Sequence, residues 1–284
     1  MTTFGKLLSL MIAFALTVSL CACGLLDPQD GSGAEAPSGD VSHASDGTNE
    51  SPAAGPSEPE QTPPPAAEKP YAVADSLKTA GVGDVVLFGS YEQNGKDDDG
   101  KEPVEWLVLD KNGSSLLLIS LYALDSGVFH DEREYVCWDG STMRAWLNGA
   151  FLNGTFSSEE RSAIRNTVVT AEASPEYPNV PAGSDTEDKI FLLSIREAER
   201  YFAGDAARAC SPTEGMVAAG GFTRSNKPWY ASHDYACLWW LRSPGMDKLK
   251  IAYVDKGGKI SFGGNQIDYD NKTCIRPALW VTAE

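Results

Sequence analysis

Positive charge and histidine are the two properties that this sequence has least of. Its 284 residues include 23 Lys and Arg against 40 Asp and Glu, which gives a net charge of −17 at pH 7, and only three are His. Proteins that bind nucleic acid use Lys and Arg to neutralise phosphates, so we expect no nucleic-acid partner. Three histidines leave few candidates for a catalytic base or for the ligands of a zinc site. We therefore expect no metal and no cofactor.

A membrane-spanning apolar run is also missing from the N-terminus, because the stretch from Leu7 to Leu20 is too short. With Lys6 before it and small residues and cysteines after it, this stretch is typical of a secretory signal. Leu and Ala stand at positions −3 and −1 relative to Cys23, which resembles a bacterial lipobox. We therefore expect residues 1–22 to be a lipoprotein signal peptide and Cys23 to carry acyl chains such as palmitate. The protein would then be extracytoplasmic and anchored by lipid to the bacterial cell membrane; an ordinary cleaved signal is the alternative.

The segment after the signal lacks the residues that build a core. From Asp27 to Pro70 there is no Ile, Leu, Phe, Tyr or Trp, and nine acidic residues stand against one Lys. Such a composition cannot bury enough apolar surface to offset the loss of backbone entropy on folding. We expect residues 23–70, the lipidated Cys and its acidic Pro-, Ser-, Gly- and Ala-rich linker, to be a disordered tether. Residues 71–284 are long enough for a single globular domain.

Within this domain, β-rich runs alternate with short amphipathic helices. Ser141, Ser157 and Ser194 can each cap a helix, and the last two belong to capping boxes. Asn112-Gly113 predicts a hairpin between the runs beside it. The β-rich runs are 83–91, 104–109, 115–121, 189–193, 238–242, 250–254, 259–262 and 273–281. Their order predicts an α+β fold with mixed or antiparallel sheets and two to three short helices, in which the first and last strands meet.

An acidic loop at residues 93–101 resembles a calcium-binding loop in composition. With Gly100 at the sixth position, however, the first and twelfth ligand positions would fall on Gly95 and Trp106, which offer no side-chain oxygen. We therefore expect a solvated hairpin tip at this loop.

The domain contains an even number of cysteines, Cys137, Cys210, Cys237 and Cys274. In an extracytoplasmic protein they could form two disulfides in any of three pairings. We favour Cys237 with Cys274, because each precedes one of two Arg-containing segments. Buried thiols that act as small apolar residues are the alternative.

Five motifs follow one another in the order W-D-G-S-T-M-R-A-W-L-N, F-S-S-E-E, D-K-I-F-L-L-S, W-W-L-R-S-P-G and I-R-P-A-L-W. In this order they resemble a family of bacterial extracytoplasmic domains, the domain of unknown function 6273, over nearly all of residues 87–281. More distantly, the W-x-L-R-S strand and the terminal R-P-A strand are similar to the ends of C-type-lectin-like and formylglycine-generating-enzyme-like folds. The resemblance implies a C-type-lectin-like α+β fold and carries no function with it.

Trp239 and Trp240 must face opposite sides if their segment is a strand. One would enter the core, and the other would face a second layer or a groove. Arg242 lies where the strand ends, so its guanidinium could either staple a loop to the sheet or help to form the groove. Four further residues are expected to be structural: Arg144, Trp146, Arg276 and Trp280.

A binding module is the function that these residues favour. The aromatic segment with Trp229, Tyr230 and His233 suits a ligand such as a carbohydrate, a cell-wall fragment or a peptide, because sugar faces are apolar and their rims form hydrogen bonds. We include Trp239, Trp240 and Arg242 among the candidate ligand-binding residues. A protein-protein interaction or structural component of the envelope is the alternative within the same setting.

An enzyme is the less favoured class, and we name no catalytic residue. A hydrolytic triad would have to use His130 or His233, and the sequence around His233 does not resemble a nucleophile elbow. A cysteine-dependent oxidase of the formylglycine-generating type would need a reduced cysteine pair in the groove.

Overall fold

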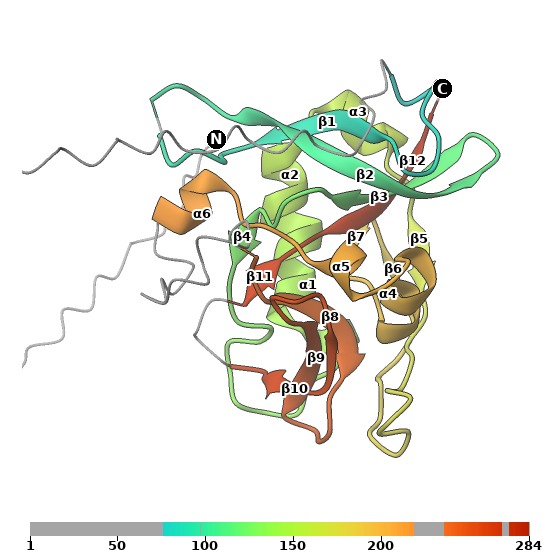
Figure 1. The fold of residues 1–284 in the computed structure, drawn as a ribbon, viewed down its shortest axis with the longest axis vertical. Coiled ribbons are helices and arrows are strands. Elements are labelled where there is room, and N and C mark those ends of the chain that lie inside the picture. Colours follow the sequence, from blue (N-terminus) through green and yellow to red (C-terminus); the bar gives the residue numbers. More distant parts are fainter. Residues whose placement is uncertain (1–75, 97, 219–235, 269–272, 284) are drawn as a thin grey trace, which may run out of the picture. The chain divides into compact units, whose positions relative to one another are not determined.

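The computed structural model describes residues 76–96, 98–218, 236–268 and 273–283. They all belong to the second of two units into which the chain divides, Pro64–Glu284. Figure 1 shows these residues as strands and short helices, so the α+β class predicted from the sequence is confirmed. None of the helices in the described ranges has the length and apolar character needed to cross a membrane.

The first sheet has five strands in the order β1-β2-β3-β12-β7, and each neighbouring pair is antiparallel. The strands are β1 (Val85–Tyr91), β2 (Glu102–Asn112), β3 (Ser115–Ser120), β7 (Ile190–Phe191) and β12 (Ala278–Thr282). The predicted hairpin joins β2 to β3, and Gly113 in its turn has a φ of 61°, which side chains with a Cβ seldom adopt. The first and last strands share this sheet but do not pair, because β12 pairs with β3 instead.

The second sheet also has five strands, in the order β10-β9-β8-β11-β4. They are β4 (Asp125–Ser126), β8 (Trp239–Pro244), β9 (Lys250–Val254), β10 (Ile260–Gln266) and β11 (Cys274–Ile275). β8 and β11 are parallel, and the other pairs are antiparallel. A two-stranded sheet pairs β5 (Thr167–Val169) with β6 (Thr186–Asp188).

The helices are short and more numerous than predicted. They are η1 (Trp138–Gly140), α1 (Thr142–Trp146), η2 (Leu147–Phe151), α2 (Leu152–Thr155), α3 (Ser158–Ala163), α4 (Ile195–Tyr201), α5 (Asp205–Arg208) and α6 (Glu214–Ala218). The three predicted caps are present: Ser141 accepts from the Arg144 amide, and Ser157 and Ser194 each form a full capping box. The number was underestimated because α5 and α6 are too short to show a helical period in the sequence.

The segment η2 is a π-helical stretch that continues α1 directly. Its Asn148 reaches the edge of the first sheet, where the side-chain oxygen accepts from the Lys189 and Ile190 amides at 2.9 and 3.1 Å. The Asn148 amide nitrogen donates to the Ile190 carbonyl at 2.8 Å. One side chain thus fixes the helical segment against β7.

Candidate functional site

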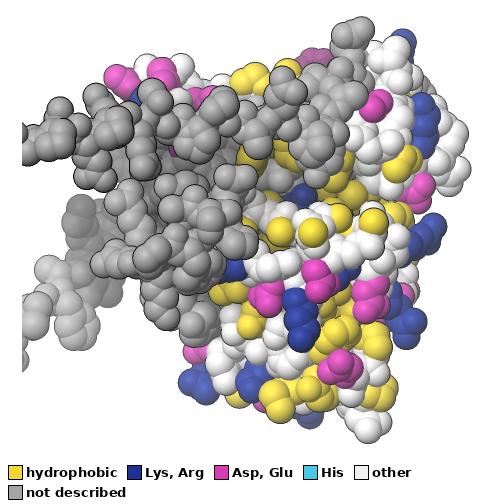
Figure 2. Space-filling model, in the orientation of Figure 1, with side chains coloured by type: hydrophobic (Ala, Val, Ile, Leu, Met, Phe, Trp, Pro, Cys, Tyr) yellow, Lys and Arg dark blue, Asp and Glu magenta, His cyan; other side chains and the backbone are white. Residues whose placement is uncertain are grey.

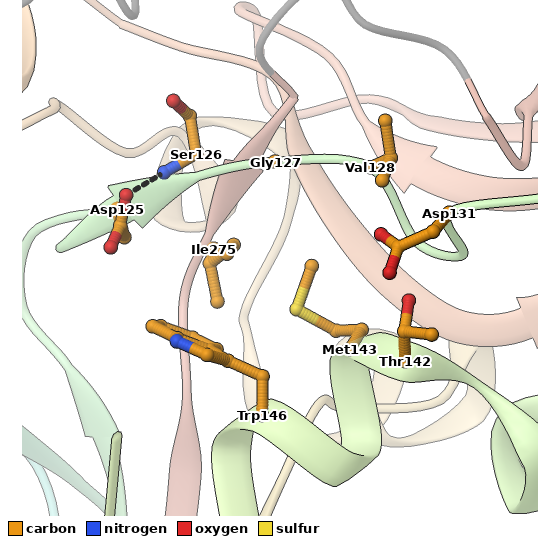
Figure 3. Close-up of a pocket in the computed structure, with 9 residues that line it drawn as sticks. All are labelled: Asp125, Ser126, Gly127, Val128, Asp131, Thr142, Met143, Trp146 and Ile275. Carbon is orange, nitrogen blue, oxygen red and sulfur yellow. Dashed lines mark hydrogen bonds between the residues drawn. The ribbon is translucent and has the colours of Figure 1, made fainter. Parts of the chain in front are cut away.

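A cleft of about 300 Å³ lies between α1 and the chain that leaves β4 (Figure 3). Its lining comes from residues 125–128 and Asp131 on one side, Thr142, Met143 and Trp146 on the other, and Ile275 between them. The ring of Trp146 lies below Ile275, whereas Asp131 and Thr142 lie at the other end. Segments that are far apart in the sequence therefore form one cleft.

Trp146 provides the aromatic surface of this cleft. It is half-buried and packs on Phe151, with 5.2 Å between the ring centroids. The π-helical stretch places Phe151 at this position one turn after Trp146, and π-helical turns are frequent at functional sites. Part of the indole is thus supported by protein, and the rest is open to the cleft.

Asp125 is the carboxylate that the protein holds most firmly in the cleft. Its Oδ2 accepts from the Tyr91 hydroxyl at 2.5 Å, and its Oδ1 accepts from the Ser126 amide at 2.7 Å. Burial, and then the hydrogen bond to Asp125, raise the pKa of Tyr91 above its ordinary value. The Tyr91 hydroxyl therefore remains a donor to Asp125 across the neutral pH range.

The ring of Phe151 packs against both Tyr91 and Trp146. Its ring lies 5.3 Å from that of Tyr91 and 5.2 Å from that of Trp146, measured between centroids. A continuous contact thus runs from Trp146 through Phe151 and Tyr91 to Asp125. The aromatic surface and the carboxylate are fixed relative to each other before any ligand arrives, which lowers the entropic cost of binding.

The opposite end of the cleft is more open. Asp131 is exposed, and Thr142 donates its amide to Nδ1 of the buried His130 at 3.2 Å. The Nε2 of His130 lies 3.5 Å from the Glu134 carboxylate, outside the lining. The lining thus offers an aromatic face, three apolar side chains, two carboxylates and two hydroxyls, and no Lys, Arg, His or Cys. Such a set suits binding of a polar ligand with an apolar face.

Two other clefts of similar size have different linings. One of about 320 Å³ is lined by Trp280, but its Arg165 is already bonded to Ser115. Another of about 380 Å³ is lined by Tyr122 and several acidic residues and contains no Trp. Of these three clefts, the Trp146 cleft is the one that joins a tryptophan ring to a carboxylate held by the protein.

The expectation that Trp239 or Trp240 faces a groove requires correction, because both side chains have no exposed surface. They do face opposite sides of β8. Trp239 packs edge-on against Phe202 and donates to the Arg208 carbonyl, whereas Trp240 packs edge-on against Phe129 and donates to the Gly127 carbonyl. The second sheet is covered on both faces here, so each tryptophan enters a different part of the core.

Arg242 is likewise removed from solvent, with 5% of its surface exposed, and its place among ligand-binding residues is corrected. Its Nη1 donates to the Leu192 carbonyl at 2.7 Å and also pairs with the Glu197 carboxylate at the start of α4. The backbone amide of Arg242 donates to the Leu193 carbonyl at 2.9 Å. The guanidinium therefore ties β8 to the chain between β7 and α4.

Arg144 and Arg276 hold loops to the sheets in a similar way. Arg144 Nε donates to the buried Asp188 at 2.7 Å, and Trp138 donates to the same carboxylate at 2.9 Å. Arg276 donates to the Ser120 carbonyl at 2.9 Å, and its guanidinium lies over the Trp239 ring.

The remaining candidate residues divide into two groups. Trp280 and Trp146 both pack partly against the core, and both also line clefts. Cys23, Trp229, Tyr230 and His233 lie outside the described residues.

All four cysteines of the domain are buried thiols in this structure, with no disulfide between them. Cys237 contacts Cys210, whose carbonyl accepts from both its amide and its thiol, and it also contacts Cys274. Burial raises the pKa of the Cys210 and Cys237 thiols well above the ordinary value. A disulfide between Cys237 and Cys274 stays a prediction, and the two side chains are in contact in this structure.

The acidic loop brings Glu92, Asp99 and Glu102 together, with carboxylate oxygens within 4.8 Å of one another. The loop itself uses these oxygens. Glu92 accepts from three successive backbone amides beginning at Asn94, and the Asn94 side chain donates to Asp99 and Glu102. These bonds account for the acidic residues as stabilisers of the turn.

Sequence analysis did not assign several lining residues of the cleft, among them Asp125, Ser126, Asp131, Thr142 and Met143, nor Tyr91 and Phe151, which contact the lining from behind. Asp125 stands in a strand of two residues, which has no period to detect. Trp146 was recognised in the sequence as an apolar residue at helical spacing, and such spacing does not tell a core side chain from one at a cleft rim.

The family comparison assigns a large part of the chain. Residues 112–283 match the model of a family described as "Domain of unknown function (DUF6273)". No match was found among curated proteins, and none among solved structures. The matched range includes Asp125, Trp146 and Ile275 but begins after Tyr91.

Proposed function

The chain belongs to the DUF6273 family of domains of unknown function, and from that premise we propose that it is a lipid-anchored extracytoplasmic protein that binds carbohydrate in the Trp146 cleft without catalysis. The observation that carries this proposal is the fixed pair of an open indole face and the Asp125 carboxylate. We also propose that the fold is C-type-lectin-like, which rests on the resemblance of the W-x-L-R-S strand and the terminal R-P-A strand and adds no function of its own.

Stacking explains why a sugar suits this cleft. The C–H face of a pyranose is apolar and can cover the Trp146 ring, while its hydroxyls need acceptors and donors at the rim. Asp125 and Asp131 provide acceptors, and Ser126 and Thr142 provide hydroxyls that act as either. A short peptide could use the same polar groups but would gain less from a flat aromatic surface.

Binding is tested with the full chain displayed on liposomes, because clustering offsets weak affinity for single sites. We expect it to bind defined members of a glycan and muropeptide array, and Trp146→Ala to abolish binding. Trp280→Ala is the matched control, since it removes a half-buried tryptophan from another cleft and should bind normally. A well-folded protein that binds nothing on the array would contradict the proposal. Loss of binding in Trp280→Ala but not in Trp146→Ala would place the binding site in the Trp280 cleft instead.

Membrane attachment is tested separately by metabolic labelling with an azido fatty acid. We expect the label in the wild-type chain and its absence in Cys23→Ala, with loss of that variant from the membrane fraction. A wild-type chain without label would contradict the lipid anchor and leave the binding proposal unaffected.

A further inference from the structure

The charge of the cleft narrows the ligand further, on the premise that the proposed carbohydrate site is correct. Both charged residues of the lining are acidic, Asp125 and Asp131, and no Lys or Arg lines it. Figure 2 shows acidic and basic side chains interspersed over the face in view.

The bonds made by Asp125 favour a ligand that donates. Both of its oxygens already accept a hydrogen bond from the protein, one from Tyr91 and one from Ser126. Each oxygen retains a second lone pair, and an ionised carboxylate can only accept. A donor with positive charge forms a stronger bond with such a group than a neutral hydroxyl does.

The indole ring of Trp146 also favours a positively charged ligand, for a different physical reason. The face of a tryptophan ring attracts cations through its quadrupole, more strongly than Tyr or Phe do. Met143 and Ile275 beside it are buried and apolar, so part of the cleft has a lower polarity than bulk water. Attraction between opposite charges is less screened in such surroundings.

One kind of ligand fits the Asp125 carboxylate, the Trp146 ring and the apolar side chains beside it. We propose that the cleft binds a pyranose that carries a free ammonium group, as in the glucosamine units of a de-N-acetylated polysaccharide. The sugar face lies on Trp146 and the ammonium group faces the Asp125 carboxylate, while Asp131 at the other end of the cleft adds negative charge that attracts the same group. N-acetylation of the same sugar removes the charge and leaves both carboxylates without a cationic partner.

The test compares glucosamine tetramers with N-acetylglucosamine tetramers, titrated into the full chain in a buffer acidic enough to protonate the sugar amine. We expect about tenfold tighter binding of the glucosamine oligomer. Raising the salt concentration should weaken this binding and leave the acetylated oligomer almost unchanged. Trp146→Ala should abolish the binding of both.

Charge-neutral variants assign the preference to the cleft. Asp131→Asn should bring the two affinities to within about twofold, because it removes one of the two lining charges without changing the side-chain volume. Glu132→Gln is the matched control, since Glu132 is exposed, adjacent in sequence and outside the lining, and it should keep the preference.

The outcomes separate this inference from the proposed function. Equal binding of both oligomers, or a preference for the acetylated one, with loss of both in Trp146→Ala, would overturn the ammonium ligand and leave the carbohydrate site standing. A preference that persists unchanged in Asp131→Asn, or that Glu132→Gln removes equally, would show general attraction to an acidic protein and overturn it too. Binding that does not depend on Trp146 would overturn both proposals.

Discussion

Two regions of this domain use tryptophan beside a charged side chain, and they do so in opposite ways. In β8, Trp239 and Trp240 are fully buried, and Arg242 is bonded to carbonyls and a carboxylate inside the protein. In the cleft, Trp146 is only half-buried, and each Asp125 oxygen accepts one hydrogen bond from the protein and can accept another. The more conspicuous motif in the sequence is the structural one, and the isolated tryptophan carries the candidate site.

The largest difference between the two regions should appear in stability. Trp240→Ala removes a fully buried ring and leaves the Gly127 carbonyl without its donor. We expect a loss of about 3–5 kcal/mol in the free energy of unfolding, enough to unfold a marginal domain. Denaturant titration followed by near-ultraviolet circular dichroism measures it. A loss below about 1 kcal/mol would mean that β8 is not the core strand described here.

Arg242→Lys tests whether the charge or the fork of the guanidinium matters in β8. A lysine keeps the charge but has one terminal nitrogen, so it cannot replace both Nη1, which bonds to the Leu192 carbonyl and the Glu197 carboxylate, and Nη2, which donates to the Thr170 carbonyl at 3.4 Å. We expect the free energy of unfolding to fall by about 2 kcal/mol and the affinity for sugar of the folded fraction to remain unchanged. Normal stability with lost binding would restore Arg242 to a ligand groove.

Trp146→Ala is the counterpart in the cleft, with a smaller effect on stability and a larger one on binding. Because the ring is half-buried, we expect the free energy of unfolding to fall by about 1–2 kcal/mol. Sugar binding should be lost, as measured by the array and by titration. Trp146→Phe should recover part of the binding, and a Phe variant as inactive as Ala would argue against stacking.

Tyr91→Phe gives the smallest effect and examines the link between Phe151 and Asp125. It removes one hydroxyl, so we expect a loss of about 1 kcal/mol in stability and a several-fold weaker affinity. The raised pKa of Tyr91 means that the unfolded chain releases this proton first as the pH rises. The contribution of Tyr91 is therefore complete below about pH 10 and declines above it. The wild-type chain should lose more stability than Tyr91→Phe over that alkaline range, as followed by thermal unfolding, and identical profiles would contradict the raised pKa.

The features that sequence analysis predicted correctly are local. The caps at Ser141, Ser157 and Ser194 depend on residues within one helical turn, and the β2–β3 hairpin depends on its own turn. Each could be found without knowing the rest of the chain.

The features that escaped sequence analysis depend on distant packing. Whether Trp239 and Trp240 are exposed is decided by Phe202 and Phe129, which lie on other segments and cover the two faces of β8. The cleft joins Asp125, Trp146 and Ile275, and nothing in the sequence near any one of them indicates the other two. Spacing along a strand or helix assigns a face to each side chain but does not say what lies against that face.

The contact between Asn148 and β7 has a consequence for how copies of this protein behave beside one another. A sheet edge with unpaired amides and carbonyls can recruit a strand from a neighbouring chain, which leads to aggregation. At Ile190 the Asn148 side chain engages both the backbone amide and the carbonyl, as a partner strand would. Copies of this protein at high local concentration would therefore present a sheet edge that is already closed at this residue.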